Sequence, residues 1–439
     1  MSTQISKRLR WGLAVAVIFL VSSAAPATQV RPAIAATGPA NGLVCTTGAS
    51  PNPTFTLTAS SGYIGLPDGN TMYMWSYSEG NSGFQHPGPV LCVNQGDTVT
   101  IILRNNLPED VSIIFPGQED VLADGALAQP QFAGSVLTSL TKAAAANGGS
   151  VTYRFVAAQP GTYLYESGTD VPKQVFMGLF GALVVRPSME ITYPGRHFVY
   201  NRLDSEFNPE PDGEILMLLS EIDPFLNQAV ERGLSFNMTN YHPRYWLING
   251  RGFPDTIAPN FAGWLPTQPY GALAHIHPYD PTANPLPYLE RFLNVTSLDT
   301  AFHPHGRNLR IIGRDGHPVA GPVGEDLSYE LFSMPVGPGQ TWDGLFKFYD
   351  PEGYDPVTNP VPVTLPSLQN LTIGMFYSGS PYLGMMGPMP PGMSTLNQCG
   401  EFYIIAHDHA LFHLSSWGAP MSGPITFMRV DPPLPNMCP

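Results

Sequence analysis

The stretch Phe302-His303-Pro304-His305-Gly306 decides how this chain is interpreted, together with a second stretch nearer its end, His407-Asp408-His409-Ala410-Leu411-Phe412-His413. Side chains alternate between the two faces of a β-strand, so a His-x-His pair on a strand sends both imidazoles to the same face. Each pair is therefore shaped to close on a metal ion.

The residues around these stretches predict short strands joined by many turns. The chain of 439 residues contains 47 prolines, 44 glycines, 19 tyrosines and 23 phenylalanines, and only 12% of its residues are charged. Turn residues separate extended runs at the spacing of a β-sandwich. We expect an all-β protein with strands at residues 55–58, 97–103, 150–156, 161–165, 181–185, 214–220, 245–247, 288–294, 309–312, 342–348, 401–407 and 425–430.

The first 36 residues have the order of a secretory signal peptide. Three basic residues (Lys7, Arg8 and Arg10) precede an apolar run at 11–21, and the segment ends in small residues at 33–36. That run is too short for a good membrane span. We therefore expect a secreted, periplasmic or cell-surface protein with no stable membrane span after cleavage.

The remaining chain is acidic and long enough for two domains. The leading segment contains four basic residues, Lys7, Arg8, Arg10 and Arg31, and no acidic residue. Without it, 16 basic residues and 34 acidic residues remain, which gives a net charge of −18. This charge argues against nucleic acid as a partner. The length predicts one domain at 37–190, a linker at 191–212 and a second domain at 213–439, which carries long Pro/Gly-rich insertions at 254–284 and 351–397.

Four cysteines can be oxidised in an exported protein. The simplest of the three pairings joins Cys45 to Cys92 and Cys399 to Cys438. The alternative to a disulfide is a cysteine thiolate bound to copper, but none of the four cysteines lies within either histidine stretch.

Several stretches occur in an order and spacing that resemble those of the multicopper oxidase family, which is built from cupredoxin β-sandwiches. They are Asp97-Thr98-Val99-Thr100-Ile101-Ile102-Leu103-Arg104-Asn105-Asn106-Leu107, Gly161-Thr162-Tyr163-Leu164-Tyr165, Gly178-Leu179-Phe180-Gly181-Ala182-Leu183-Val184-Val185, Tyr245-Trp246-Leu247-Ile248-Asn249-Gly250-Arg251-Gly252-Phe253-Pro254 and the two histidine stretches. The resemblance covers nearly all of the exported chain. It implies two cupredoxin-like Greek-key sandwiches.

The resemblance implies a metal site in the second domain alone. Its topology places the two histidine stretches on neighbouring strands, so His303, His305, His407 and His409 would converge on copper or zinc, with His413 as a fifth candidate. In the first domain, residues 114–117 and 166–168 stand where the family has its other two histidine pairs. All four ligands expected there are missing.

The chain also lacks most of the ligands that form the blue copper centre in the family. The alignment places Thr300 at its first imidazole, Asp408 at its thiolate and the axial position near Gly418, which leaves only His413 as a ligand, with Met421 close enough in sequence to substitute at the axial position. Asp408 could be an oxygen ligand. Because it points away from its two histidine neighbours, the simpler expectation is that it accepts hydrogen bonds from the backbone or from His413.

Most of the other candidates keep more than one interpretation. Glu166 is either a metal ligand or base, or a residue at a strand end. His275 and His277 form a separate metal site, complete a neighbouring subunit's cluster in a homo-oligomer, or lie in an ordinary loop. The methionines between Met375 and Met393 bind Cu(I) or fill gaps in a core. We interpret His86 and His242 as structural or solvated turn residues.

Three functions remain after these considerations. The first is a protein that binds copper or zinc through its histidine cluster and lacks a blue copper centre. The second is a copper-dependent oxidoreductase with a reduced mononuclear or dinuclear site. The third is a structural or surface-assembly protein with a vestigial site. A complete multicopper oxidase cycle is not expected, because the blue copper centre, through which electrons would enter, is missing.

Overall fold

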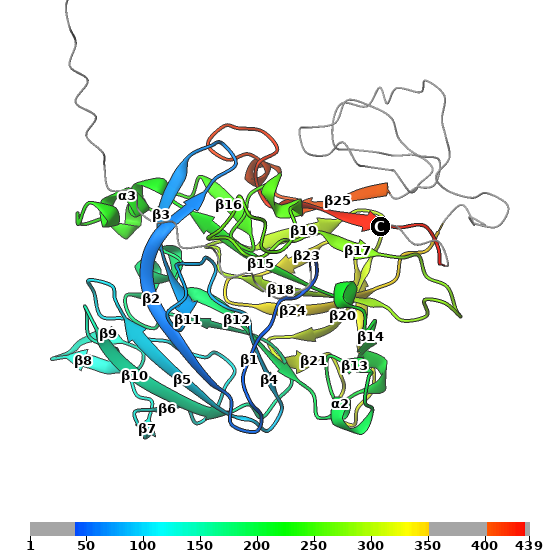
Figure 1. Ribbon diagram of the computed structural model, residues 1–439, viewed down its shortest axis with the longest axis horizontal. Coiled ribbons are helices and arrows are strands. Elements are labelled where there is room, and N and C mark those ends of the chain that lie inside the picture. The colour runs from blue at the N-terminus through cyan, green and yellow to red at the C-terminus, as the bar shows by residue number, and fades with distance from the viewer. Residues whose placement is uncertain (1–39, 351–401, 435–439) are drawn as a thin grey trace, which may run out of the picture. The chain divides into compact units, whose positions relative to one another are not determined.

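The computed structural model describes residues 40–350 and 402–434 of the chain. Strands dominate this part, which confirms the predicted all-β class (Figure 1). No helix within it is long and apolar enough to cross a membrane. The helical pieces are short: α1 (Val171–Phe176), α2 (Met189–Thr192), α3 (Pro224–Glu231) and the 3-10 turns η1 (Leu203–Ser205), η2 (Pro211–Gly213), η3 (Met238–Asn240), η4 (Asp255–Ile257) and η5 (Leu411–Leu414).

The first half of the chain forms a sandwich of two sheets, with strand orders β1-β4-β12-β11 and β3-β2-β5-β10-β6-β7. Leu57 and Tyr153 from the larger sheet share one hydrophobic core with Leu183 from the smaller one. The hairpin β8–β9 stands apart from both sheets. The strands are β1 (Thr46–Thr47), β2 (Thr54–Gly65), β3 (Thr71–Glu79), β4 (Leu91–Asn94), β5 (Thr98–Asn105), β6 (Leu122–Ala123), β7 (Ala126–Leu127), β8 (Gln131–Ala133), β9 (Val136–Ser139), β10 (Gly149–Val156), β11 (Gly161–Glu166) and β12 (Phe180–Arg186).

The second half forms another sandwich, with sheets β16-β15-β18-β24-β20-β21 and β17-β26-β25-β19-β23; β22 pairs with β20. Phe292 and Trp342 of the first sheet meet Phe302 and Met428 of the second in one core. The strands are β15 (Glu214–Ile222), β16 (Tyr245–Ile248), β17 (Ala274–Ile276), β18 (Tyr288–Asn294), β19 (Thr300–Pro304), β20 (Leu309–Arg314), β21 (His317–Pro318), β22 (Tyr329–Leu331), β23 (Met334–Val336), β24 (Thr341–Phe346), β25 (Phe402–Asp408) and β26 (Ile425–Val430).

The segment predicted as a linker packs closely against the second sandwich. It contains α2, η1 and the small sheet of β13 (His197–Phe198) and β14 (Glu206–Phe207). Its apolar side chains Tyr200 and Phe207 are buried in a cluster with Leu289 and Leu345. Burial of these side chains removes apolar surface from water, which is why the segment is not an extended tether.

A further hydrophobic cluster joins the two sandwiches. Leu164 and Val184 of the first sandwich meet Leu218 and Leu293 of the second. The described residues of both sandwiches belong to one compact unit, residues 37–439. Contacts between the halves are therefore part of the folded core rather than a loose domain contact.

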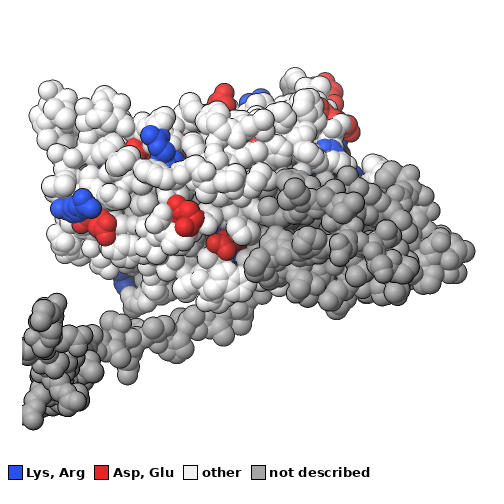
Figure 2. Space-filling view, turned by 90° about the horizontal axis from the view of Figure 1, so that it is seen from above, with Lys and Arg blue, Asp and Glu red and all other residues white. Residues whose placement is uncertain are grey.

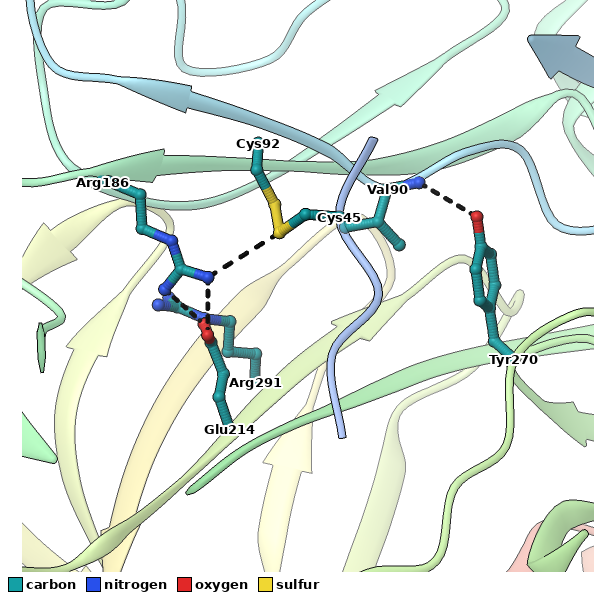
Figure 3. Close-up of a disulfide and its surroundings, with 7 residues drawn as sticks. All are labelled: Cys45, Val90, Cys92, Arg186, Glu214, Tyr270 and Arg291. Atoms are coloured by element: carbon teal, nitrogen blue, oxygen red, sulfur yellow. Dashed lines mark hydrogen bonds and ion pairs between the residues drawn. A yellow bond between two sulfur atoms is a disulfide. The ribbon is translucent and has the colours of Figure 1, made fainter. Parts of the chain in front are cut away.

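Buried charges cross the same contact (Figure 3). Arg186, at the end of β12, donates to Glu214 of β15 over 2.9 and 2.6 Å. Arg291 of β18 also donates to Glu214, and its other end donates to Asp343 over 3.2 Å. Although burial favours protonation, the two arginines lower the pKa of Glu214 to about 2. Glu214 is therefore ionised at neutral pH.

The disulfide between Cys45 and Cys92 lies beside this network, and the predicted pairing of these two cysteines is confirmed (Figure 3). It closes a loop with a sequence separation of 47 residues. Cys399 and Cys438, the methionine-rich loop and the predicted signal segment lie outside the described residues.

Candidate metal centre

Strand pairing brings the two histidine stretches together. β19 and β25 are antiparallel neighbours, and His303 stands opposite His407 in their register. His305 follows the end of β19, and the backbone N–H of His409 donates to Ala301 over 2.8 Å. The two His-x-His pairs therefore lie on one face of the sheet, as the sequence predicts.

The four imidazole rings form a tight group. Ring centroids are 4.8 Å apart for His303 and His305, 5.0 Å for His303 and His409, and 5.2 Å for His305 and His407. The Nε2 atoms of His305 and His407 are 3.2 Å apart. His407 is buried, whereas His305 and His409 are exposed. The group therefore runs from the protein interior to the surface.

Backbone carbonyls fix the orientation of two rings. The Nδ1–H of His303 donates to the carbonyl of Phe332 over 2.7 Å, and that of His407 donates to the carbonyl of Asp408 over 2.8 Å. Such bonds leave Nε2 as the nitrogen that can bind a metal. Burial, followed by the neighbouring imidazoles, lowers the pKa of His305. Burial also lowers that of His407. Both rings therefore favour the neutral form that metal ligation requires.

The donor set suits copper or zinc, both of which accept imidazole nitrogen. Two nitrogens on one tetrahedral ion, each about 2.0–2.1 Å from it, are about 3.3 Å apart. The His305–His407 spacing matches this value. In residues 40–350 and 402–434, however, no group of three or more ligating side chains is already arranged to hold an ion.

Asp408 and His413 form a separate pair. Asp408 accepts a hydrogen bond from the backbone of Ala410 over 3.0 Å, and its other oxygen faces Nδ1 of His413. The His413 ring stacks on Trp246 with centroids 4.6 Å apart. The structure thus gives Asp408 the hydrogen-bonding role expected of it, and it places His413 with Asp408 rather than with the four clustered rings.

The corresponding place in the first sandwich holds no imidazole. Ile114 and Glu166 are bridged through their backbones, with N···O distances of 2.8 and 3.2 Å. Burial raises the pKa of the Glu166 carboxyl. Glu166 is thus a partly buried residue at the end of β11, and its backbone pairs with Ile114, in the segment where the other histidine pair was expected.

His275 lies in β17, an edge strand of the sheet that contains β19 and β25, and His277 directly follows this strand. His275 Nδ1 is 2.8 Å from Asp212 and its Nε2 is 2.6 Å from Asp431. Burial disfavours the charged imidazole, but these hydrogen bonds outweigh it and raise the pKa of His275 to about 9. With carboxylates on both nitrogens, His275 is an imidazolium within an ion-pair group. Nδ1 of His277 lies 3.1 Å from the carbonyl of Pro432.

The two turn histidines differ. His86 is completely buried, and burial lowers its pKa to about 3, so it is a neutral structural residue. His242 is partly exposed beside a cavity of about 530 Å³ lined by Trp246, Phe412 and Trp417.

A larger cavity of about 990 Å³ opens beside the histidine group, and His303 and His305 form part of its wall. Arg307 lines the same cavity and forms a buried ion pair with Glu290. Sequence reasoning missed this pair. The signal was available, since Glu290 and Arg291 stand as two charges inside an otherwise apolar strand.

Comparisons with known proteins relate the chain to copper oxidases. The family model described as multicopper oxidase matches residues 80–190. L-ascorbate oxidase of Cucurbita maxima is 32% identical over 184 residues, which cover 40% of this chain and 27% of that protein. Putative laccase-11 of Oryza sativa subsp. japonica is 26% identical over 272 residues, which cover 60% of this chain and 41% of that protein. The chain therefore spans well under half the length of these relatives.

Solved structures show the same fold. A multicopper oxidase called mgLAC has a TM-score of 0.56 at 19% identity, and a blue copper oxidase from Nitrosomonas europaea has 0.55 at 17%; each comparison covers 87% of this chain and 86% of the other. Copper is the cofactor that these relatives imply. Residues 80–190 match the multicopper oxidase family model, and the described part of the chain has the fold of solved multicopper oxidases.

Proposed function

We propose that this is an exported protein that binds copper, or zinc, through His303, His305, His407 and His409 and that has no blue copper centre. The convergence of the four rings carries the proposal, and above all the 3.2 Å between the Nε2 atoms of His305 and His407. Export is supported by the signal-like order of residues 7–35 and by the disulfide, which is stable in an oxidising compartment.

The chemistry of the remaining positions argues against a blue centre. Such a centre needs a thiolate, and Asp408 occupies the position where the family has one. Cys45 and Cys92 are joined to each other, so neither can supply it. The Asp408 carboxylate is already engaged by Ala410 and His413.

The chain's own groups prepare the imidazoles for a metal. The carbonyls of Phe332 and Asp408 engage Nδ1 of two rings and leave Nε2 as the nitrogen that can bind a metal, and burial favours the neutral form of His407. When bound, copper would supply one-electron chemistry, and zinc would supply only a Lewis acid.

Metal analysis of the purified full chain tests the proposal. After reconstitution with copper or zinc, we expect about one ion per chain at the histidine cluster. His305→Ala and His407→Ala should each lose it, whereas His317→Ala, an exposed histidine at β21, should not. Less than about half an ion per wild-type chain would overturn the proposal. An intense thiolate-to-copper band in the visible spectrum would overturn the absence of a blue centre.

The large cavity favours a second candidate, a copper-dependent oxidoreductase that receives electrons directly from its substrate. The cavity gives a ligand access to His303 and His305. Oxygen uptake with phenolic, metal-ion or nitrite partners would support this candidate if His407→Ala abolished it. Equal uptake by His407→Ala would rule it out.

A further inference from the structure

The hairpin of β8 and β9 projects from the first sandwich and leaves backbone groups on its edges unpaired (Figure 1). Phe132 stands opposite Leu137 and Ala133 opposite Val136, and in the described part of the chain these strands form a sheet with no third strand. No backbone hydrogen bond joins residues 129–137 to any other described residue. A strand edge of this kind presents N–H and C=O groups that can pair with another strand.

The hairpin is tight at its tip and fixed at its base. Its two-residue turn, Gly134-Ser135, has glycine first with a φ of 64°, which is the pattern of a type II′ turn. At the base, Ser139 is 3% exposed, and its Oγ is 3.0 Å from Oγ of Ser112 and 2.9 Å from Oγ1 of Thr169. The bridge between Ser139 and Thr169 ties β9 to the body of the sandwich. The edge of β8 is therefore the freer of the two.

The side chains on this hairpin are apolar and exposed. Phe132 is 61% exposed, Val136 64% and Leu137 49%. Cross-strand neighbours share a face of a sheet, so Phe132 and Leu137 lie together on one side of the hairpin and Val136 lies on the other. A two-stranded hairpin is only marginally stable by itself in water, and exposed apolar surface often marks an interaction site. A partner that adds a strand would satisfy the backbone edge and bring apolar side chains against these residues.

The distribution of charge indicates which partner fits this hairpin. No charged residue occurs from Gly125 to Thr141, although the chain carries a formal net charge of −14. By comparison, the face shown in Figure 2 carries both acidic and basic side chains. Two copies of an acidic protein repel each other, so a charge-free element is the place where they can approach closely. Natural edge strands are commonly protected by a lysine or another charge, and neither β8 nor β9 has one.

We propose that this hairpin is a self-association element, through which two copies of the chain pair their β8 edges antiparallel about a two-fold axis. A strand edge is self-complementary under such an axis, because N–H groups of each copy meet C=O groups of the other. The result is one continuous sheet in the order β9-β8-β8-β9, with Phe132 of both copies in the contact. The contact needs no metal ion and lies on the first sandwich, so it is independent of the histidine cluster.

Sedimentation equilibrium of the purified full chain tests this inference. We expect a monomer–dimer equilibrium with a Kd of about 1–100 µM, as suits a small interface. Phe132→Asp should raise this Kd at least about tenfold, because it places a carboxylate of each copy in the contact. The matched control is Val323→Asp. It makes the same kind of change at a residue that is 85% exposed, between β21 and β22 of the second sandwich, and it should alter the Kd less than about twofold.

A second variant and a second measurement cover the case in which Phe132→Asp does not fold. Leu137→Asp, on the neighbouring strand, should also weaken the dimer, and hydrogen exchange of the wild-type β8 amides should slow as the chain concentration rises. A wild-type chain that stays monomeric above about 100 µM, a dimer that survives both hairpin variants, or β8 exchange that does not change with concentration would each overturn the inference. Equal weakening by Val323→Asp would also overturn it. A monomer that sediments with lipid vesicles would overturn it in favour of a membrane surface.

Discussion

The two sandwiches make the same backbone contact with different side chains. In the first, Ile114 bridges Glu166; in the second, His303 stands opposite His407 on adjacent strands. The first bridge is complete although neither of its side chains is an imidazole. Strand pairing at this place therefore depends on backbone hydrogen bonds and the cores beneath, and the metal-binding side chains are an addition to it.

The halves also differ in how they are held. The first sandwich carries the disulfide of Cys45 and Cys92, whereas the second contributes the buried Arg291 with its two carboxylate partners, Glu214 and Asp343. The first sandwich thus gains stability from a covalent bond, and the second gains it from buried ion pairs. Four measurements test this comparison of the two sandwiches.

Removal of the disulfide should have the largest effect. A closed loop of this length stabilises the folded state by about 4 kcal/mol through the entropy of the unfolded chain. Cys45→Ala with Cys92→Ala should lower the free energy of unfolding by roughly that amount in urea denaturation. Either single variant should lose nearly as much, because one substitution already breaks the bond. A loss below about 1 kcal/mol would show that the first sandwich does not depend on the covalent link.

Arg291→Met should lower the free energy of unfolding by about 3 kcal/mol, because it leaves Glu214 and Asp343 buried with fewer partners. The matched control is Arg310→Met, whose partner Asp326 is about half exposed and which should cost less than about 1 kcal/mol. Equal losses in the two variants would contradict the role given to the buried network.

The ion-pair group of His275 should make stability depend on pH on the alkaline side. Its pKa in the folded chain, about 9, lies above its ordinary value of 6.5. The stabilisation is therefore complete below pH 6.5 and is lost as the pH rises through 9. We expect a loss of about 1–2 kcal/mol, allowing for partial exposure.

His275→Gln provides the control for this pH dependence. It keeps a hydrogen-bonding side chain but cannot titrate, so its stability should stay flat over the same alkaline window. Asp212, Asp431 and Arg429 face His275, and Arg429 donates to Asp431 over 2.7 Å. An identical decline in wild type and variant would assign the effect to other groups.

The smallest effect is expected at Glu166. Burial disfavours its charged form, so Glu166→Gln should leave stability unchanged or raise it by less than about 1 kcal/mol at neutral pH. His407→Gln provides the contrast, because it should abolish the rise in melting temperature that added copper gives the wild type. A loss of copper stabilisation in Glu166→Gln instead would place a ligand in the first sandwich.

The sequence predicted the strands and the histidine face well, because both depend on a periodicity of two. It also identified the Cys45–Cys92 pair and the hydrogen-bonded role of Asp408. It did not foresee that the segment at 191–212 packs against the second sandwich, since proline-rich composition hides the burial of Tyr200 and Phe207. The Arg307–Glu290 pair was also missed: the two charges within the apolar strand at 288–294 were a signal of a buried ion pair, but only the fold identifies Arg307 as the partner of Glu290.

The distance along the chain between the two histidine stretches has a kinetic consequence. His305 and His407 touch although 102 residues separate them. Contacts of such long range form late, after the entropy of closing the intervening loop has been lost. Until the two strands pair, each histidine stretch can bind a metal only through its own imidazole nitrogens. The selectivity of a site made from both stretches therefore arises only in the folded protein. An ion captured too early would hold one strand in isolation and compete with correct pairing.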